Sequence, residues 1–240
     1  MLQRIRAGMI ANLTQLPNYT CHEVVNRFYR SINSGRLDHV DVVEFEVAFV
    51  NNRELFARPG ADRFDEQSIT NVVSNGTIGN GAFGSHAESI FSENVASFKY
   101  GGQSKKEGHK TFRYDFEVPQ EKSHFQVKHA GAEGIVGYKG SFWVDIDSLE
   151  LVRLELKAEH IPSYIGVSSV HEVIRYKRVQ LKNSDFLLPG KSELTATDTS
   201  GSYSLNMTNL ERCREFVGES AVTFDTPGST APTESQAPSH

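Results

Sequence analysis

The sequence predicts a mainly β domain of the α+β class: a curled antiparallel sheet of about 11 strands, covered by an N-terminal helix and a mid-chain helical insertion. Three observations predict it. Apolar and polar residues alternate through most of the chain after residue 40, short polar turns separate the alternating segments, and no helical pattern lies between the later strands. Because a sheet of this size rarely stays flat, we expect it to curl into a half-barrel over the helices.

Length and composition fit one large β-domain. The chain has 240 residues, of which 38% are hydrophobic and 23% are charged, which is enough apolar material for a core and speaks against wholesale disorder. The formal net charge is −5 with both signs interspersed, and this argues against nucleic acid as a partner, which requires a basic face. No run approaches the roughly 18 apolar residues of a transmembrane segment.

The N-terminal segment, residues 1–18, is predicted to be a helix that packs on the sheet. Apolar residues at spacings of three and four predict one helix face over residues 2–15. These residues are Leu2, Ile5, Met9, Leu13 and Leu16. Pro17 ends the helix. Residues 19–31 fit either a helix face or a long strand, and we favour the strand because it begins with Tyr-Thr-Cys and contains a Val pair.

The strand signal is clearest between residues 43 and 49. Every second residue there is apolar, which predicts a half-buried strand. The alternating apolar residues are Val43, Phe45, Val47 and Phe49. Asn51-Asn52 then fits a two-residue hairpin turn, because Asn tolerates the positive φ that such turns need. Residues 53–58 are predicted to return as the second strand.

Residues 62–92 interrupt the β pattern. Residues 65–73 and 85–91 look helical, and the glycine-rich stretch 76–84 between them is predicted to be a loop. This loop has no nearby Lys-Ser/Thr pair and no preceding strand, so a phosphate-binding loop is disfavoured. We expect a lid or linker between two covering helices, placed where it could gate a cavity.

The predicted β-domain spans residues 19–225. After the interruption at 62–92, it consists of successive strands. The predicted strands lie near 95–103, 110–118, 123–129, 134–145, 149–159, 168–182, 185–198, 202–209 and 218–224. Short polar turns join them, so hairpins and an antiparallel sheet follow. Residues 226–240 are mostly Pro, Ser, Thr, Ala and Gly, and we expect this tail to be disordered because it has too little apolar surface to bury.

The two cysteines, Cys21 and Cys213, allow two interpretations. Their spacing excludes a CxxC motif and a Cys-rich zinc site. One interpretation is a disulfide between the first strand and one of the last, worth about 5 kcal/mol on the chain-entropy model and implying an oxidising compartment. The other is a pair of buried reduced thiols. The polar neighbours of both cysteines favour the disulfide, since a core thiol usually has apolar neighbours.

Two later segments resemble a known family. Residues 140–156 read Gly-Ser-Phe-Trp-Val-Asp-Ile-Asp-Ser-Leu-Glu-Leu-Val-Arg-Leu-Glu-Leu, and residues 186–194 read Phe-Leu-Leu-Pro-Gly-Lys-Ser-Glu-Leu before a turn at Gly201. Together they resemble the outer-membrane lipoprotein-carrier and lipoprotein-sorting superfamily of bacterial envelopes, in the broad sense that includes related sigma-factor regulators. The resemblance implies a curled antiparallel sheet over helices, with a hydrophobic cavity that holds acyl chains or an apolar segment.

A closer resemblance is to an uncharacterised group of secreted bacterial proteins. It rests on Tyr-Thr-Cys-x-Glu at residues 19–23 and Cys-Arg-x-Phe-x-Gly-Glu-Ser at residues 213–220. Neither resemblance assigns a functional residue to a position in this chain. They imply a periplasmic or secreted protein, although the start of this sequence lacks the apolar stretch of a signal peptide.

Local motifs for metal binding are missing from the sequence. His124 and His129 are five apart on a predicted strand and therefore point to opposite faces. Asp145 and Asp147 lie in a predicted turn that lacks the glycine and distal glutamate of a calcium loop. We therefore predict no metal and no cofactor, apart from a site that only the fold could assemble from distant segments.

Local motifs for catalysis are missing as well. Gly84-Ser85-His86 lacks the Gly-x-Ser-x-Gly pattern of a nucleophile elbow. Glu44 and Glu46 lie on the polar face of their strand, and no aromatic platform for a sugar accompanies them. We predict no catalytic residues and expect that the protein is not an enzyme.

The leading functional hypothesis is a non-enzymatic envelope protein that binds a lipid or lipidated peptide in a cavity between sheet and helices. The alternating pattern makes five apolar residues candidates for lining that cavity, or plain core residues. They are Phe45, Phe49, Phe142, Leu154 and Leu156. The alternative is an interaction or sensor module with a packed core that binds an envelope protein, and a third is a hydrolase with a dispersed site.

Overall fold

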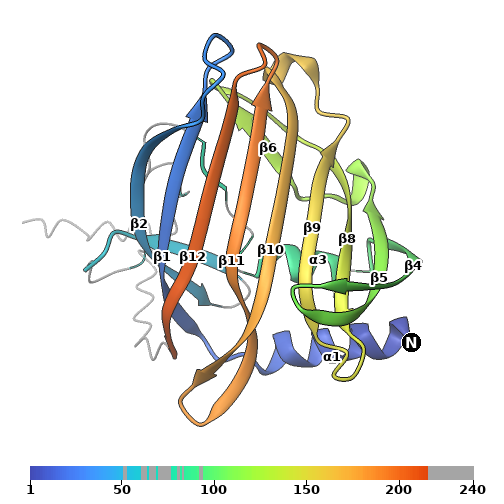
Figure 1. Ribbon diagram of the computed structural model, residues 1–240. Coiled ribbons are helices and arrows are strands. Elements are labelled where there is room, and N and C mark those ends of the chain that lie inside the picture. The colour runs from blue at the N-terminus through green and yellow to red at the C-terminus, as the bar shows by residue number, and fades with distance from the viewer. Residues whose placement is uncertain are drawn as a thin grey trace, which may run out of the picture.

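Ten strands form a single antiparallel sheet in the computed structural model (Figure 1). The structure describes residues 1–50, 53–60, 64, 69, 77–79, 82, 84–91 and 94–215. The strand order is β3-β2-β1-β12-β11-β10-β9-β8-β5-β4. The mainly β, curled antiparallel class predicted from the sequence is therefore confirmed. Four predicted features lie wholly or almost wholly outside the described residues: the helix at 65–73, the turn at 51–52, the strand at 218–224 and the tail at 226–240.

The strands of the main sheet have the following bounds. They are β1 (Tyr19–Arg30), β2 (Asp38–Val50), β3 (Arg53–Ala57), β4 (Ser97–Lys106), β5 (His109–Val118), β8 (Gly137–Asp145), β9 (Leu151–Glu159), β10 (Val167–Leu181), β11 (Ser184–Asp198) and β12 (Tyr203–Glu215). The ambiguous segment at 19–31 is thus a strand, as predicted. The strand predicted at 202–209 extends to Glu215, because the whole length of β12 pairs with β1.

A separate hairpin of β6 (Gln126–His129) and β7 (Ala132–Ile135) stands apart from the main sheet. The sequence placed residues 123–129 and 134–145 in the main sheet, and for β6 and β7 this was wrong. Ala130 and Gly131 both adopt positive φ, at 48° and 86°, which is the geometry of a tight two-residue hairpin turn. This turn folds the chain back on itself before β8 begins.

The last strand lies in the middle of the sheet. β12 pairs with β1 on one side and with β11 on the other, so the two ends of the described β-domain are hydrogen-bonded neighbours. The sheet stays open, with β3 and β4 at its edges. Edge strand β4 carries lysines and adjacent glycines, a composition that discourages edge-to-edge association.

Two helices, α1 (Leu2–Gln15) and α3 (Ser85–Phe91), pack on the inner face of the sheet. In Figure 1 α1 runs along the lower margin of the sheet, and α3 lies behind β9 and β8. Ile5 and Met9 are the buried residues of α1, in agreement with the predicted apolar face. The Asn12 side chain accepts a hydrogen bond from the Leu187 amide at 3.1 Å and donates one to the Leu187 carbonyl at 3.0 Å.

Three apolar clusters fill the inner side of the sheet. The first joins α1 and α3 to strands β5, β8, β9 and β10, and it contains Phe142, Leu154 and Leu156. The second lies on β1, β2 and β3 and contains Phe45 and Phe49. The third packs the β6–β7 hairpin onto β9, β10 and β11. The space between these clusters is where the molecule departs from an ordinary apolar core.

Candidate functional site

Buried polar side chains gather in the middle of the inner face. We call this set the inner polar patch; its members come from β1, β10, β11 and β12. They are Glu23, Arg27, Glu172, Ser192, Asn206 and Thr208, and each is at most 9% exposed. A sheet core normally presents apolar side chains at inward positions, and buried polar groups are costly unless they are hydrogen-bonded.

Strand register brings the members of the patch together. Glu172 on β10 pairs with Leu194 on β11, Leu194 pairs with Asn206 on β12, and Asn206 pairs with Arg27 on β1. These residues therefore lie in one row across four strands. Ser192 and Thr208 form the adjacent inward row, which ends at Val25. The patch thus lies where the three apolar clusters meet, over the central strands.

Two members of the patch are well satisfied. The guanidinium of Arg27 donates two hydrogen bonds to the Asp41 carboxylate, at 2.7 and 2.6 Å. Hydrogen bonding to Arg27 lowers the pKa of Asp41. Asn206 donates a 2.8 Å hydrogen bond from its amide to the carbonyl of Thr77, so a piece of the glycine-rich loop packs directly on the patch.

Glu172 pairs with a histidine from α3. The Nε2 atom of His86 lies 3.1 Å from a carboxylate oxygen of Glu172, and both side chains are buried. Burial lowers the pKa of His86, but the hydrogen bond and charge of Glu172 raise it more, so the net shift is upward. The protonated imidazole is therefore favoured, and the pair fastens α3 to the sheet.

Glu54 holds the start of the same helix. One of its carboxylate oxygens accepts hydrogen bonds from the backbone amides of Gly84 and Ser85, at 3.0 and 3.2 Å, and from the Ser85 hydroxyl at 3.0 Å. This carboxylate from β3 therefore satisfies amide groups at the first turn of α3 that have no partner inside the helix. Two acidic side chains from opposite parts of the sheet thus position α3.

Glu23 differs from Glu172, the other acidic member of the patch. It is 8% exposed, and within the described residues its carboxyl group forms neither a hydrogen bond nor an ion pair. Burial, followed by the charges of Glu54 and Glu172, raises its pKa from 4.5 to about 8. At neutral pH this carboxyl group is therefore mostly protonated.

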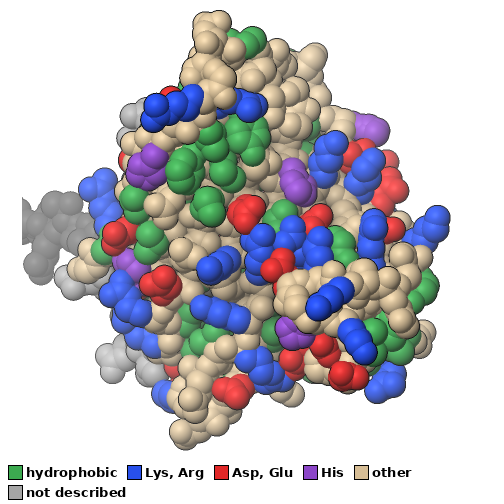
Figure 2. All heavy atoms as spheres, viewed as in Figure 1, with side chains coloured by type: hydrophobic (Ala, Val, Ile, Leu, Met, Phe, Trp, Pro, Cys, Tyr) green, Lys and Arg blue, Asp and Glu red, His purple; other side chains and the backbone are tan. Residues whose placement is uncertain are grey.

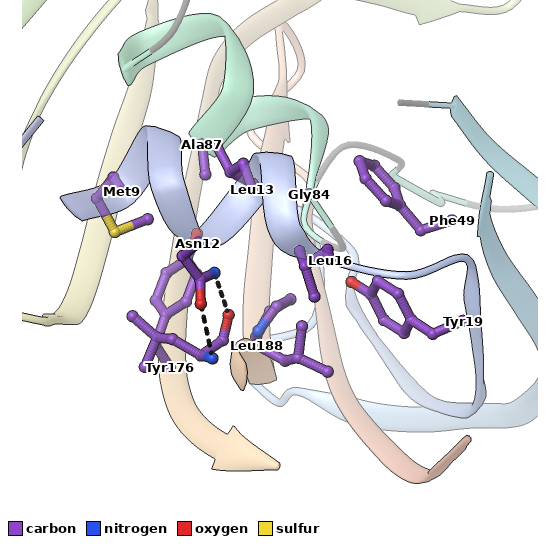
Figure 3. A pocket seen from close by; sticks show the side chains of 12 residues that line it. Met9, Asn12, Leu13, Leu16, Tyr19, Phe49, Gly84, Ala87, Tyr176 and Leu188 are labelled. Atoms are coloured by element: carbon purple, nitrogen blue, oxygen red, sulfur yellow. Dashed lines mark hydrogen bonds between the residues drawn. The ribbon is translucent and has the colours of Figure 1, made fainter. Parts of the chain in front are cut away.

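A small pocket adjoins the patch beneath α1 (Figure 3). Its walls are largely apolar and come from α1, the start of α3 and strands β1, β2, β10 and β11. The lining residues are Met9, Asn12, Leu13, Leu16, Tyr19, Phe49, Gly84, Ala87, Tyr176, Leu187, Leu188 and Pro189. Its volume is about 10 Å³, room for about one water molecule. α1 therefore closes this part of the interior almost completely.

Tyr176 places a buried hydroxyl group at this pocket. Its hydroxyl is buried and has no hydrogen-bond partner in the described part of the chain. Burial raises its pKa well above the usual value, so the hydroxyl stays protonated. Buried polar atoms in native proteins are nearly always hydrogen-bonded. A buried phenol without a partner among the described residues, on the same inner face as the buried carboxyl group of Glu23, therefore calls for a functional explanation.

All five predicted lining residues are buried, at 4% exposure or less. Phe49 lines the pocket beneath α1. Phe45 is the register partner of Glu23, and Leu156 is the register partner of Glu172, so these two border the inner polar patch. Phe142 and Leu154 lie within the first apolar cluster, farther from the patch. Whether any of the five contacts a ligand remains a prediction.

The polar members of the patch were not predicted as site residues from the sequence. The signal was present, since Glu23 occupies an inward position between Cys21 and Val25, and Glu172 occupies one next to Ile174 along the strand. A charged residue at an apolar position of an alternating strand indicates such a site.

Glu44 and Glu46, expected to face solvent, both contact the outward-facing His22 at 3.2 and 3.3 Å.

Cys21 and Cys213 form a disulfide across β1 and β12, with a separation of 192 residues in sequence. Of the two interpretations of the cysteines, the structure therefore has the disulfide. The register between the two strands shifts at this point, between Thr20 and His22. The bridge thus fixes the pairing of the first and last described strands.

The outer face bears a groove of about 600 Å³ over β4, β5, β8, β9 and β10. Charged side chains of both signs line it, and Figure 2 shows them interspersed on this side of the molecule. Many of these charges are paired, as in Arg113 with Asp115 at 2.7 Å, so the groove presents no field of one sign.

Among the described residues, no group of three potential ligands could hold a metal ion, and no helix is long and apolar enough to cross a membrane.

No protein-family model and no curated protein matches the sequence. Among solved structures, an outer membrane lipoprotein-sorting protein domain from Vibrio parahaemolyticus is 11% identical over 90% of this chain and 92% of that chain, with a TM-score of 0.46. A DUF1329 family protein from Desulfovibrio piger is 10% identical over 90% and 92%, with a TM-score of 0.44. The lipoprotein LppX of Mycobacterium tuberculosis is 10% identical over 88% and 95%, with a TM-score of 0.28.

Proposed function

We propose that this protein binds an amphiphilic ligand, a lipid or a lipidated peptide, between its curled sheet and its helices, without converting it chemically. The observation that supports the proposal best is the inner polar patch. It contains a buried carboxyl group that has no hydrogen bond within the described residues, and three apolar clusters share the same inner face. Polar anchoring groups surrounded by apolar walls are the usual composition of a small-molecule site.

Entry of a ligand requires α1 to move, because the pocket beneath it is almost closed. Several contacts attach α1: Ile5 and Met9 are buried, Asn12 bonds to the backbone of Leu187, and Arg6 bonds to the carbonyl of Phe91. Because no strand pairs with this single 14-residue helix, we expect it to open at a lower free-energy cost than the central strands of the sheet. α1 is therefore the lid of the proposed site.

The proposed location is the periplasm or the cell exterior. A disulfide between Cys21 and Cys213 supports it, because such bonds form and persist in oxidising compartments. A lipid or lipoprotein cargo fits the same location.

Native mass spectrometry tests the proposal, on protein purified from its own host and followed by lipid extraction. We expect a co-purifying amphiphile and, after its removal, saturable binding of a fluorescent fatty-acyl probe. Leu13→Glu places a charge in the lining of the pocket and should weaken probe binding at least tenfold. Ile10→Glu, on the exposed side of the same helix at 37% exposure, is the matched control. Absence of both a co-purifying ligand and probe binding would refute the proposal.

A second candidate is a protein-interaction module, favoured by an apolar patch on the outer face. Figure 2 shows hydrophobic side chains gathered over the upper parts of β1, β2 and β12. The most exposed are Val40 at 56%, Val42 at 46% and Met207 at 44%. Such patches are typical of protein–protein contacts. The double variant Val42→Asp/Met207→Asp should abolish capture of an envelope partner while leaving probe binding unchanged; loss of probe binding alone would exclude this role for the patch.

A further inference from the structure

We infer that the head group of the bound amphiphile is a cation, an ammonium group held by Glu23 on the inner polar patch. This inference rests on the proposed function and adds the chemical class of the ligand. It is argued from the charges that face the patch, from the groups there that lack partners and from the fate of the Glu23 proton.

Acidic side chains outnumber basic ones among the described residues that face the patch. Glu23, Glu54 and Glu172 approach it from β1, β3 and β10. Burial is the main cause of the raised pKa of Glu23, and the charges of Glu54 and Glu172 raise it further. The nearby cations already have partners, since His86 pairs with Glu172 and Arg27 pairs with Asp41. Glu54 accepts hydrogen bonds from the start of α3, whereas Glu23 has neither a cation nor a hydrogen bond among the described residues.

The neighbouring hydroxyls complete a binding site for an ammonium group. Ser192 and Thr208 are register partners on β11 and β12, and Thr208 pairs with Val25, two residues along β1 from Glu23. Within the described residues neither hydroxyl forms a hydrogen bond, although both side chains are at least nine-tenths buried. An ammonium group has three N–H donors and no acceptor. A carboxylate and two hydroxyl oxygens are acceptors that suit it.

An anionic head group fits poorly. A carboxylate or phosphate at this place would face the charges of Glu54 and Glu172, and its own burial would be uncompensated. A neutral alcohol would gain hydrogen bonds but no ion pair. The patch therefore selects for positive charge, while the alkyl chain follows the apolar lining toward the pocket beneath α1.

Binding should release a proton. In the empty protein the proton on Glu23 satisfies the site, because the pKa of this carboxyl is about 8. When an alkylammonium ion enters, the Glu23 carboxylic acid gives its proton to solvent and the resulting carboxylate pairs with the ammonium group. Charge is conserved: one cation enters and one proton leaves. Near pH 6.5, where both groups start protonated, the released amount approaches one proton per ligand.

The test compares three probes of equal chain length with the full-length, delipidated protein. Dodecylamine, dodecanol and dodecanoate are titrated calorimetrically, below their aggregation concentrations, in two buffers of different ionisation enthalpy at pH 6.5. We expect dodecylamine to bind at least tenfold more tightly than dodecanol, and only dodecylamine to release a proton. Dodecanoate should bind more weakly than dodecanol.

The variant Glu23→Gln separates this inference from the proposed function. It should reduce the preference for the amine over the alcohol to within about threefold and abolish proton release, while dodecanol still binds. Glu44→Gln, on the outer face of the neighbouring strand and 52% exposed at its side chain, should behave as wild type. A thermal melt confirms that each variant is folded.

The remaining outcomes are distinct. Equal affinity for all three probes, or a preference for dodecanoate, overturns the cationic head group while leaving amphiphile binding in place. Failure of every probe to bind overturns the proposed function itself. Retention of the amine preference in a folded Glu23→Gln protein overturns the assignment of Glu23.

Discussion

Glu23 on β1 and Glu172 on β10 lie on the same inner face of the sheet, separated by strands β12 and β11, and within the described part of the chain only Glu172 has a cationic partner. Glu172 is paired with His86, whereas Glu23 is buried with its pKa raised to about 8 by burial, by Glu54 and by Glu172 itself. The paired carboxylate anchors a helix. The unpaired one makes folding sensitive to pH.

Stability should fall as the pH rises toward 8. The unfolded chain releases the Glu23 proton near the ordinary pKa of 4.5, whereas the folded protein retains it up to about pH 8. Between these values the folded state binds more protons than the unfolded state, so the free energy of unfolding decreases as pH rises. We expect this group to account for a loss of roughly 1–3 kcal/mol between about pH 5 and pH 8.

Glu23→Gln isolates that contribution. The variant should show a flatter dependence of unfolding free energy on pH than wild type and be more stable at pH 8, in urea denaturation followed by circular dichroism. Glu44→Gln serves as the control on the outer face. If the difference between Glu23→Gln and wild type were the same at pH 5 and pH 8, the carboxyl group would not titrate as described.

The His86–Glu172 pair should show strong coupling in a double-mutant cycle. Both side chains are buried and 3.1 Å apart, so removal of either partner leaves a buried group uncompensated, at a cost of roughly 2–4 kcal/mol. We expect a coupling free energy of about 1–3 kcal/mol between the two alanine replacements. Because the pKa of His86 is raised, the contribution is full below the pKa of an unfolded histidine and declines as pH rises through the folded value.

The exposed pair Lys128–Glu133 is the control for that cycle. Its atoms are 3.4 Å apart and its side chains are 53% and 50% exposed, so solvent screens the interaction and coupling should be at most a few tenths of a kcal/mol. Comparable coupling in the two pairs would contradict the role of His86 as the anchor of α3.

The alternation of the strands could be predicted because one face of each strand is buried. Burial on one side produces a period of two, as in Val43 to Phe49, and short turns such as that at Asp145 fix antiparallel neighbours. The Asp145 carboxylate accepts hydrogen bonds from the amides of Asp147 and Ser148, which is the turn role that the sequence indicates. Local chemistry of this kind can be read without knowing the fold.

The inner polar patch could not be predicted in the same way. Glu23 and Glu172 face a common space only because β12 returns to pair with β1, and that pairing joins the two ends of the described domain. Each glutamate also directly follows a histidine in the sequence, His22 or His171. Because neighbouring residues of a strand point to opposite faces, an outward histidine places the glutamate beside it on the inner face.

Loss of the disulfide should destabilise the protein markedly. Replacing Cys21 and Cys213 with serine removes a cross-link that closes a loop of about 190 residues, and we expect the free energy of unfolding to fall by about 2–5 kcal/mol. Denaturation of wild type with and without reductant gives the same comparison without mutation. Two reactive thiols in freshly isolated, denatured wild type would show that the bond does not form in the native compartment.

Gly140 should tolerate no side chain. An added Cβ would lie 1.9 Å from the carbonyl oxygen of Glu155 and 2.9 Å from the ring of Phe116, so β8 and β9 would have to separate. We expect Gly140→Ala to lower the free energy of unfolding by roughly 2–4 kcal/mol. Gly35→Ala is the matched control, since a Cβ there would meet no atom within 4 Å. Equal thermal stability of the two variants would contradict the close approach of the strands.

The attachment of α1 should depend on Asn12. Its side chain makes two hydrogen bonds to the backbone of Leu187, and Asn12→Ala removes both, which should destabilise the docked helix by about 1–2 kcal/mol. Because the sheet does not depend on these bonds, we expect faster hydrogen exchange at α1 amides with little change in β9 and β10. If α1 is the lid of the site, the same variant should take up a fatty-acyl probe several-fold faster in stopped-flow fluorescence. Gln3→Ala, at an exposed position of the same helix, should match wild type in both measurements, and unchanged uptake by Asn12→Ala despite faster exchange would show that the ligand enters elsewhere.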